Sequence, residues 1–106
     1  MDHELTGVLS KRCYIKPSKN TKLRIVSGDP PMLFNILTED LLILSSDLGS
    51  VLKDLFSGKP LSEVVDKMNI HGKDLEELLN AIEYLSKNRW IVIECVDSSA
   101  ESDQGL

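Results

Sequence analysis

Short stretches of apolar residues dominate the first half of the chain, and their length and spacing are typical of β-strands. Two such stretches span residues 12–15 and 23–26. A Gly-Asp-Pro-Pro break at residues 28–31 follows, because its prolines fix φ and remove backbone donors. Two more strand-like stretches then cover residues 32–36 and 41–44. The first half of the chain is therefore predicted to form a small sheet.

The last two stretches are separated by residues 37–40, which is the length of a hairpin turn. We therefore expect residues 32–36 and 41–44 to pair as antiparallel strands. Residues 41–44 are apolar on both faces. Such a strand is either enclosed in a core or leaves an apolar edge that something else covers.

After residue 45 the apolar period changes from two to between three and four, which predicts three helices. The first begins at Ser45 or Ser46, whose side chains suit an N-cap, and ends at Gly58. The second starts near Pro60, and the third spans about residues 73–88. Their apolar faces consist of Leu48, Val51, Leu52, Leu55, Phe56, Leu61, Val64, Val65, Met68, Leu75, Leu78, Leu79, Ile82 and Leu85.

The order of these elements indicates an α+β fold. A three-stranded antiparallel N-terminal sheet, three helices and a short β-segment at residues 90–94 describe a winged-helix-like domain. We assign residues 11–95 to this domain. Residues 1–10 and 96–106 lack an apolar pattern, so we expect a loose N-terminus and a disordered C-terminal tail.

Composition supports a single cytoplasmic domain. The chain has 106 residues, of which 42% are hydrophobic, and no apolar run is long enough to span a membrane. The first residues carry Asp2 and Glu4 and lack the apolar core of a secretory signal. Two cysteines, Cys13 and Cys95, are too few for a disulfide framework and indicate a reducing compartment. A bridge between them is the disfavoured alternative.

Charge is unevenly distributed along the chain. Residues 1–24 carry six lysines and arginines against two acidic residues, whereas the remainder carries six against fifteen. We interpret the basic segment as a solvated, partly mobile N-terminus, although it could contact nucleic acid. The third predicted helix carries two lysines and four acidic residues, which disfavours insertion into a DNA groove.

No arrangement of residues indicates catalysis. His3 and His71 have no ligand at metal spacing, and the chain has no phosphate-binding glycine loop or nucleophile motif. We therefore expect no enzymatic activity, no catalytic residue, no metal site and no cofactor.

Residues 33–65 resemble the PqqD-like family, named for pyrroloquinoline quinone biosynthesis protein D. The similarity extends over about residues 22–94. Two positions depart from the family pattern: Ser45 stands where an Asn is common, and Asn88-Arg89 stands where a Gly is common. The residues that match are Leu44, Leu48, Leu52, Leu55, Gly58, Leu61, Val64, Val65, Leu78, Ile82 and Leu85.

This resemblance implies a precursor-peptide recognition element of a ribosomally made, post-translationally modified peptide. Such a protein captures the leader segment of the precursor and presents it to a tailoring enzyme. The partner enzyme would be a radical S-adenosylmethionine enzyme, an iron-dependent oxidase, a cyclodehydratase or a peptidase, in a heteromeric complex with this chain. The alternatives are a winged-helix DNA-binding transcriptional regulator and a plain scaffold domain.

The resemblance also places the peptide as an extra strand in a cleft walled by the third helix. We expect the backbone of residues 41–44 to pair with it, the side chains of Leu41 and Ile43 to lie nearest to it, and Leu42 and Leu44 to point inward. The predicted wall is one flank of the third helix, for which an ordinary solvated flank is the alternative. The candidate peptide-binding residues are Leu41, Leu42, Ile43, Leu44, Glu77, Ala81, Tyr84 and Asn88.

Overall fold

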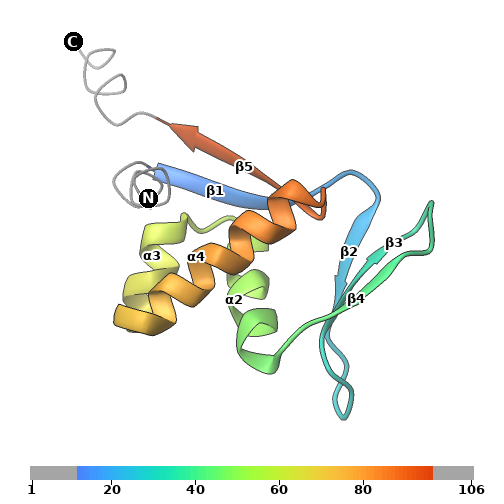
Figure 1. Ribbon diagram of the computed structural model, residues 1–106, viewed down its shortest axis with the longest axis horizontal. Coiled ribbons are helices and arrows are strands. Elements are labelled where there is room, and N and C mark those ends of the chain that lie inside the picture. The colour runs from blue at the N-terminus through green and yellow to red at the C-terminus, as the bar shows by residue number, and fades with distance from the viewer. Residues whose placement is uncertain (1–11, 97–106) are drawn as a thin grey trace.

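A computed structural model describes residues 12–96 of the chain. The predictions for residues 1–10 and for residues 97–106 of the predicted tail lie outside the described residues, whereas Val96, the first residue of that tail, is the last residue of a strand. The fold is α+β, as predicted, with three helices and two small antiparallel sheets (Figure 1). Within residues 12–96, none of the helices combines the length and the apolar composition that a membrane span requires. The elements are β1 (Arg12–Pro17), β2 (Thr21–Arg24), β3 (Met32–Asn35), β4 (Leu41–Ile43), α2 (Ser46–Phe56), α3 (Leu61–Lys67), α4 (Gly72–Lys87) and β5 (Ile91–Val96).

The three-stranded sheet has the order β2-β3-β4, so β4 is an edge strand. The predicted hairpin is confirmed, since Leu33 of β3 lies opposite Leu42 of β4 in antiparallel register. Its turn begins where the Asn35 Oδ1 accepts hydrogen bonds from the N–H groups of Leu37 and Thr38, both at 2.9 Å. This side-chain turn reverses the chain without a glycine.

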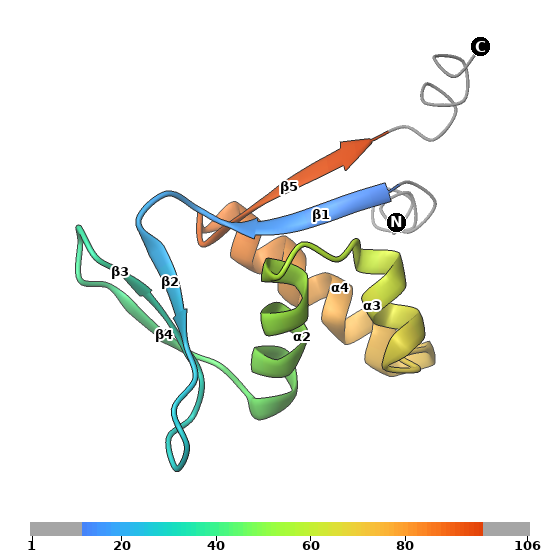
Figure 2. The ribbon, with the colours of Figure 1, turned by 180° about the vertical axis from the view of Figure 1, so that it is seen from behind.

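The second sheet was not predicted. Strand β1 leaves the N-terminal sheet and pairs antiparallel with β5, from the other end of the described chain. Figures 1 and 2 show this β1–β5 ribbon running past the three helices, while the three-stranded sheet lies at one end of the molecule. The expectation of a mobile basic N-terminus is therefore wrong for residues 12–24, which form β1, β2 and the turn between them.

The ribbon also carries a disulfide. Cys13 and Cys95 face each other in the register and are bonded. The prediction of free thiols is wrong, because spacing along the sequence cannot reveal that the two ends of the domain are paired. The disulfide also removes the argument for a reducing compartment that rested on unpaired cysteines.

The three helices begin and end close to the predicted residues. The Ser45 Oγ accepts a hydrogen bond from the Leu48 N–H and caps α2, and Gly58 follows the helix with a φ of 110°. At the end of α4, Arg89 takes the left-handed conformation, with a φ of 65°, at the place where the family pattern commonly has a Gly. One core joins the helices to both sheets, with Ile15, Leu33, Leu52, Leu55, Leu61, Val64, Ile82, Leu85 and Ile91 at its most buried positions.

Candidate functional site

Strand β4 is hydrogen-bonded to β3 on one side only. The Leu44 N–H donates to the Pro31 carbonyl at 2.8 Å, and the Asn35 N–H donates to the Asp40 carbonyl at 3.0 Å. Bonded and non-bonded residue pairs alternate along an antiparallel ladder. The bonded pair between these two is therefore that of Leu42 with its partner in β3, and the backbone groups of Leu42 point into the sheet.

The same alternation turns the backbone groups of Leu41 and Ile43 away from β3. Each of these residues directs its N–H and its C=O toward the open edge, and none of the four groups has a hydrogen-bond partner among residues 12–96. Four groups at this spacing are what an added strand needs in order to pair. We expected the whole backbone of residues 41–44 to pair with a peptide. Only Leu41 and Ile43 have backbone groups that point to the open edge.

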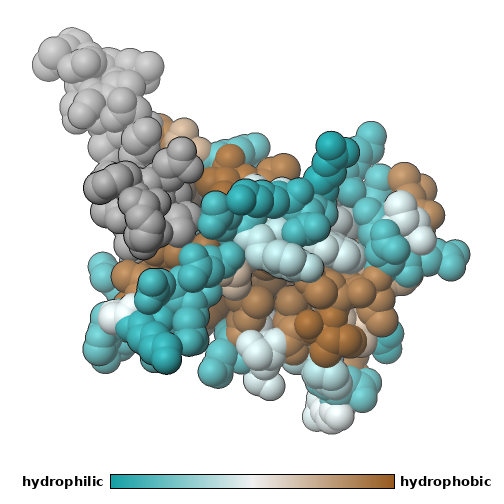
Figure 3. All heavy atoms as spheres, viewed as in Figure 1, coloured by the Kyte–Doolittle hydropathy of each residue, from teal (hydrophilic) through white to brown (hydrophobic). Residues whose placement is uncertain are grey.

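Side chains on β4 alternate in the expected sense. Leu41 is 52% exposed and Ile43 is 53% exposed, on the face of the sheet away from the core. Leu42 packs partly buried against the core, and Leu44 is a core residue with 6% exposure. Hydrophobic side chains gather on the molecular surface around β4 (Figure 3). Leu44 therefore supports the site from within and is shielded from a guest.

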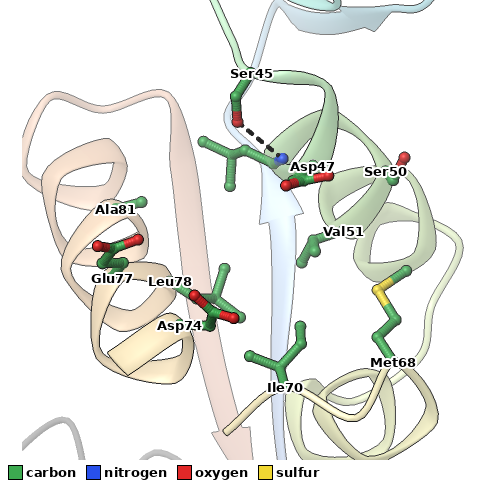
Figure 4. Close-up of a pocket in the computed structure, with 11 residues that line it drawn as sticks. Ser45, Asp47, Ser50, Val51, Met68, Ile70, Asp74, Glu77, Leu78 and Ala81 are labelled. Atoms are coloured by element: carbon green, nitrogen blue, oxygen red, sulfur yellow. Dashed lines mark hydrogen bonds between the residues drawn. The ribbon is translucent and has the colours of Figure 1, made fainter. Parts of the chain in front are cut away.

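A groove of about 410 Å³ lies between α2 and α4 and begins at Ser45, two residues after the end of β4. Its apolar wall combines side chains from both helices with two residues that follow α3, as Figure 4 shows. Three carboxylates lie among its lining residues. The apolar lining residues are Leu48, Val51, Met68, Ile70, Leu78 and Ala81, and the polar ones are Ser45, Asp47, Ser50, Asp74 and Glu77.

Packing between the β3–β4 hairpin and α2 holds the start of the groove. Gly49 lies on α2 against the buried ring of Pro31, and a Cβ at Gly49 would overlap that ring. The Leu44 N–H bonds the backbone of the same proline. The end of β4 and the first turn of α2 are therefore fixed relative to each other, and so is the angle at which the open edge meets the groove.

The predicted α4 flank is only partly on the groove. Glu77 and Ala81 line it, as the predicted wall requires. Tyr84 continues the same side of the helix beyond the groove and is 56% exposed. Asn88 donates from its side chain to the Tyr84 carbonyl at 2.8 Å, so it caps the C-terminus of its own helix. Tyr84 and Asn88 are thus not among the groove residues.

Sequence reasoning missed the wall formed by α2 and by the segment after α3. Met68 was assigned to the apolar face of the second predicted helix, and Asp47 was given no role. Helical spacing is a local pattern, so it does not reveal that α2 and α4 stand apart at this point. Ser45, by contrast, was predicted as the N-cap of the first helix, and it also lines the end of the groove next to β4.

The carboxylates on the groove form no ion pair with another residue in the described part of the chain. The three ion pairs among residues 12–96 join Lys16 to Glu94, Lys67 to Asp54 and Lys87 to Glu83. Asp47, Asp74 and Glu77 take part in none of them, and all three are exposed. The groove therefore has an apolar wall and a negatively charged rim.

Over residues 12–96, no group of three His, Cys, Asp or Glu side chains is placed to hold a metal ion. No family model matches the chain, and no curated protein or solved structure matches it either. The open edge of β4 and the groove are therefore the features from which a function can be argued.

Proposed function

We propose that this protein is a non-catalytic peptide-binding protein that captures an extended peptide by strand addition to β4. The peptide is the leader segment of a ribosomally made precursor, and the complex presents it to a tailoring enzyme. The observation that carries this proposal is the open edge of β4, where the backbone groups of Leu41 and Ile43 point outward beside an apolar groove.

Strand addition gains affinity from main-chain hydrogen bonds and specificity from pockets for alternate side chains. Both parts are available here. The Leu41 and Ile43 backbone supplies the hydrogen bonds, and the groove between α2 and α4 accepts side chains that leave the strand at the Ser45 end. A three-residue strand offers few hydrogen bonds, so the groove must contribute much of the binding free energy.

The order of elements supports the same proposal. In a winged-helix arrangement of the PqqD-like kind, a sheet strand leads directly into the first helix and the longest helix walls the cleft. Here β4 leads into α2 within three residues, and α4, the longest helix, supplies Glu77 and Ala81 to the groove. On this account Leu41 and Ile43 contact the guest, while Tyr84 lies where a longer peptide would pass.

A DNA-binding regulator remains the alternative, and the charge of α4 disfavours it. This helix carries Lys73 and Lys87 against four acidic residues, and Lys87 is paired with Glu83 at 3.4 Å. An exposed acidic helix would be repelled by a polyanion.

A titration tests the proposal. The full-length protein is mixed with fluorescently labelled leader peptide from the precursor encoded beside its gene, and we expect a Kd of about 1 µM or tighter. Ile43→Asp should abolish binding, because it places a charge on the apolar edge. Val92→Asp is the matched control, since Val92 is also an exposed strand residue, at 43%, but lies on β5.

Two results would contradict the proposal. One is duplex DNA binding with a steep salt dependence while the leader peptide does not bind, which favours the regulator. The other is peptide binding that Ile43→Asp leaves unchanged, which would place the peptide elsewhere on the protein.

A further inference from the structure

The groove between α2 and α4 has a charge pattern that restricts its guest. Asp47 on α2 and Asp74 on α4 point toward the space between the two helices from opposite sides, and Glu77 lies one turn further along α4 (Figure 4). The lining between these carboxylates is apolar and includes Val51, Ile70 and Leu78. A guest that only filled the apolar wall would leave three negative charges around it without a counter-charge.

We propose that the guest peptide carries a lysine or arginine at the end of its strand that lies against Ser45, next to apolar residues that enter the groove. This inference rests on the proposed function and adds the chemical class of the peptide. A long basic side chain suits the place, because its methylene stem covers apolar surface while its charged head stays at the rim. The carboxylates of Asp47, Asp74 and Glu77 would then lie around that head.

Interactions with the helix dipoles explain why two of these carboxylates are present, but they do not neutralise the charges. Asp47 and Asp74 lie in the first turns of α2 and α4, where a carboxylate interacts favourably with the helix dipole. Glu77 lies beyond the first turn and has no such role. It also has no lysine or arginine partner among the described residues.

The terminal segments of this chain are poor candidates for the guest on charge grounds. Residues 97–106 contain three acidic residues and no basic one, and residues 1–11 contain one lysine against two acidic residues. Neither segment complements an acidic rim. A separate basic peptide therefore fits better than a segment of the protein itself.

A randomised peptide library displayed on phage and selected on the full-length protein tests this inference. We expect enriched peptides to combine an alternating apolar segment with a flanking lysine or arginine. Replacing that residue by glutamine in a synthetic copy should weaken binding about fivefold, the scale of a partly exposed ion pair.

Two neighbouring carboxylates on α4 provide matched variants. Glu77→Gln should weaken binding of the basic peptide about threefold. It should leave the affinity for the peptide whose basic residue is replaced by glutamine unchanged, as expected for a direct charge pair. Glu76→Gln removes the same charge from an exposed residue that does not line the groove, and should change neither affinity.

The outcomes separate the two proposals. Enriched peptides that depend on Ile43 but show no preference for basic residues would overturn this inference and leave the proposed function standing. Equal effects of Glu76→Gln and Glu77→Gln would also overturn it. If no enriched peptide depends on Ile43, the proposed function fails, and this inference fails with it.

Discussion

The two edges of the three-stranded sheet differ in how they are protected. On the β2 edge, the exposed side chains are Lys22 and Arg24, and the Thr21 N–H is already bonded to the Ser18 carbonyl at 3.0 Å. On the β4 edge, the exposed side chains are Leu41 and Ile43, and the outward backbone groups have no partner among residues 12–96. Proteins commonly use lysine to prevent pairing at an edge. The β2 edge is therefore protected by charged side chains, whereas the β4 edge is apolar and open, as the proposed strand addition requires.

Because β4 is short, its open edge alone should not pair stably with strands of arbitrary sequence. Only Leu41 and Ile43 offer outward hydrogen bonds, which is too few for stable pairing with an arbitrary strand. A peptide that also fills the adjoining groove gains additional apolar burial. Specificity would then reside in the groove, while the edge fixes the direction and register of the guest.

The largest effect is expected from two proline substitutions in β4, one of which removes an N–H that points into the sheet and the other an N–H that points to the open edge. Leu42→Pro removes an N–H that donates into the sheet, so the Leu33 carbonyl loses its donor and stability should fall by about 1–3 kcal/mol. Ile43→Pro removes an N–H that points outward, and proline is tolerated at such an edge position. Urea unfolding of both variants measures the difference.

Ile43→Pro should nevertheless weaken peptide binding by about tenfold, because the guest loses one main-chain donor. Equal destabilisation by the two prolines would contradict the hydrogen-bond pattern assigned to β4.

A smaller effect is expected when protection of the β2 edge is removed. Replacing both Lys22 and Arg24 by threonine should change stability by only about 0.5 kcal/mol, since both are surface residues. The unprotected edge should, however, increase self-association, which sedimentation velocity over a concentration series measures.

The control for that experiment is Lys53→Gln with Lys73→Gln, which removes the same charge from exposed helical positions. If the control self-associates to the same extent, loss of net charge and not loss of edge protection is responsible.

Local signals in the sequence predicted the β3–β4 hairpin, the Ser45 cap and the extent of the three helices. Each depends on residues within a few positions of one another, such as Asn35 in the turn. The β1–β5 ribbon could not be predicted in this way, because Cys13 and Cys95 are 82 positions apart and no local pattern indicates that they face each other.

The candidate site was predictable to the same limited degree. Alternation along β4 indicated which side chains face outward, and helical spacing placed Glu77 and Ala81 together. The α2 wall depends on the separation of two helices in space, to which no local pattern corresponds. Asn88 illustrates the converse, since its spacing fits the flank but its side chain caps α4.

Amide hydrogen exchange measured by NMR, with and without leader peptide, tests the central claim most directly. In the free protein the account predicts slow exchange at Leu42 and Leu44 and fast exchange at Leu41 and Ile43. Saturating peptide should slow exchange at Leu41 and Ile43 and leave Leu23 on the β2 edge unchanged. Protection of Leu41 and Ile43 without peptide, or no gain of protection at either residue with it, would contradict the account.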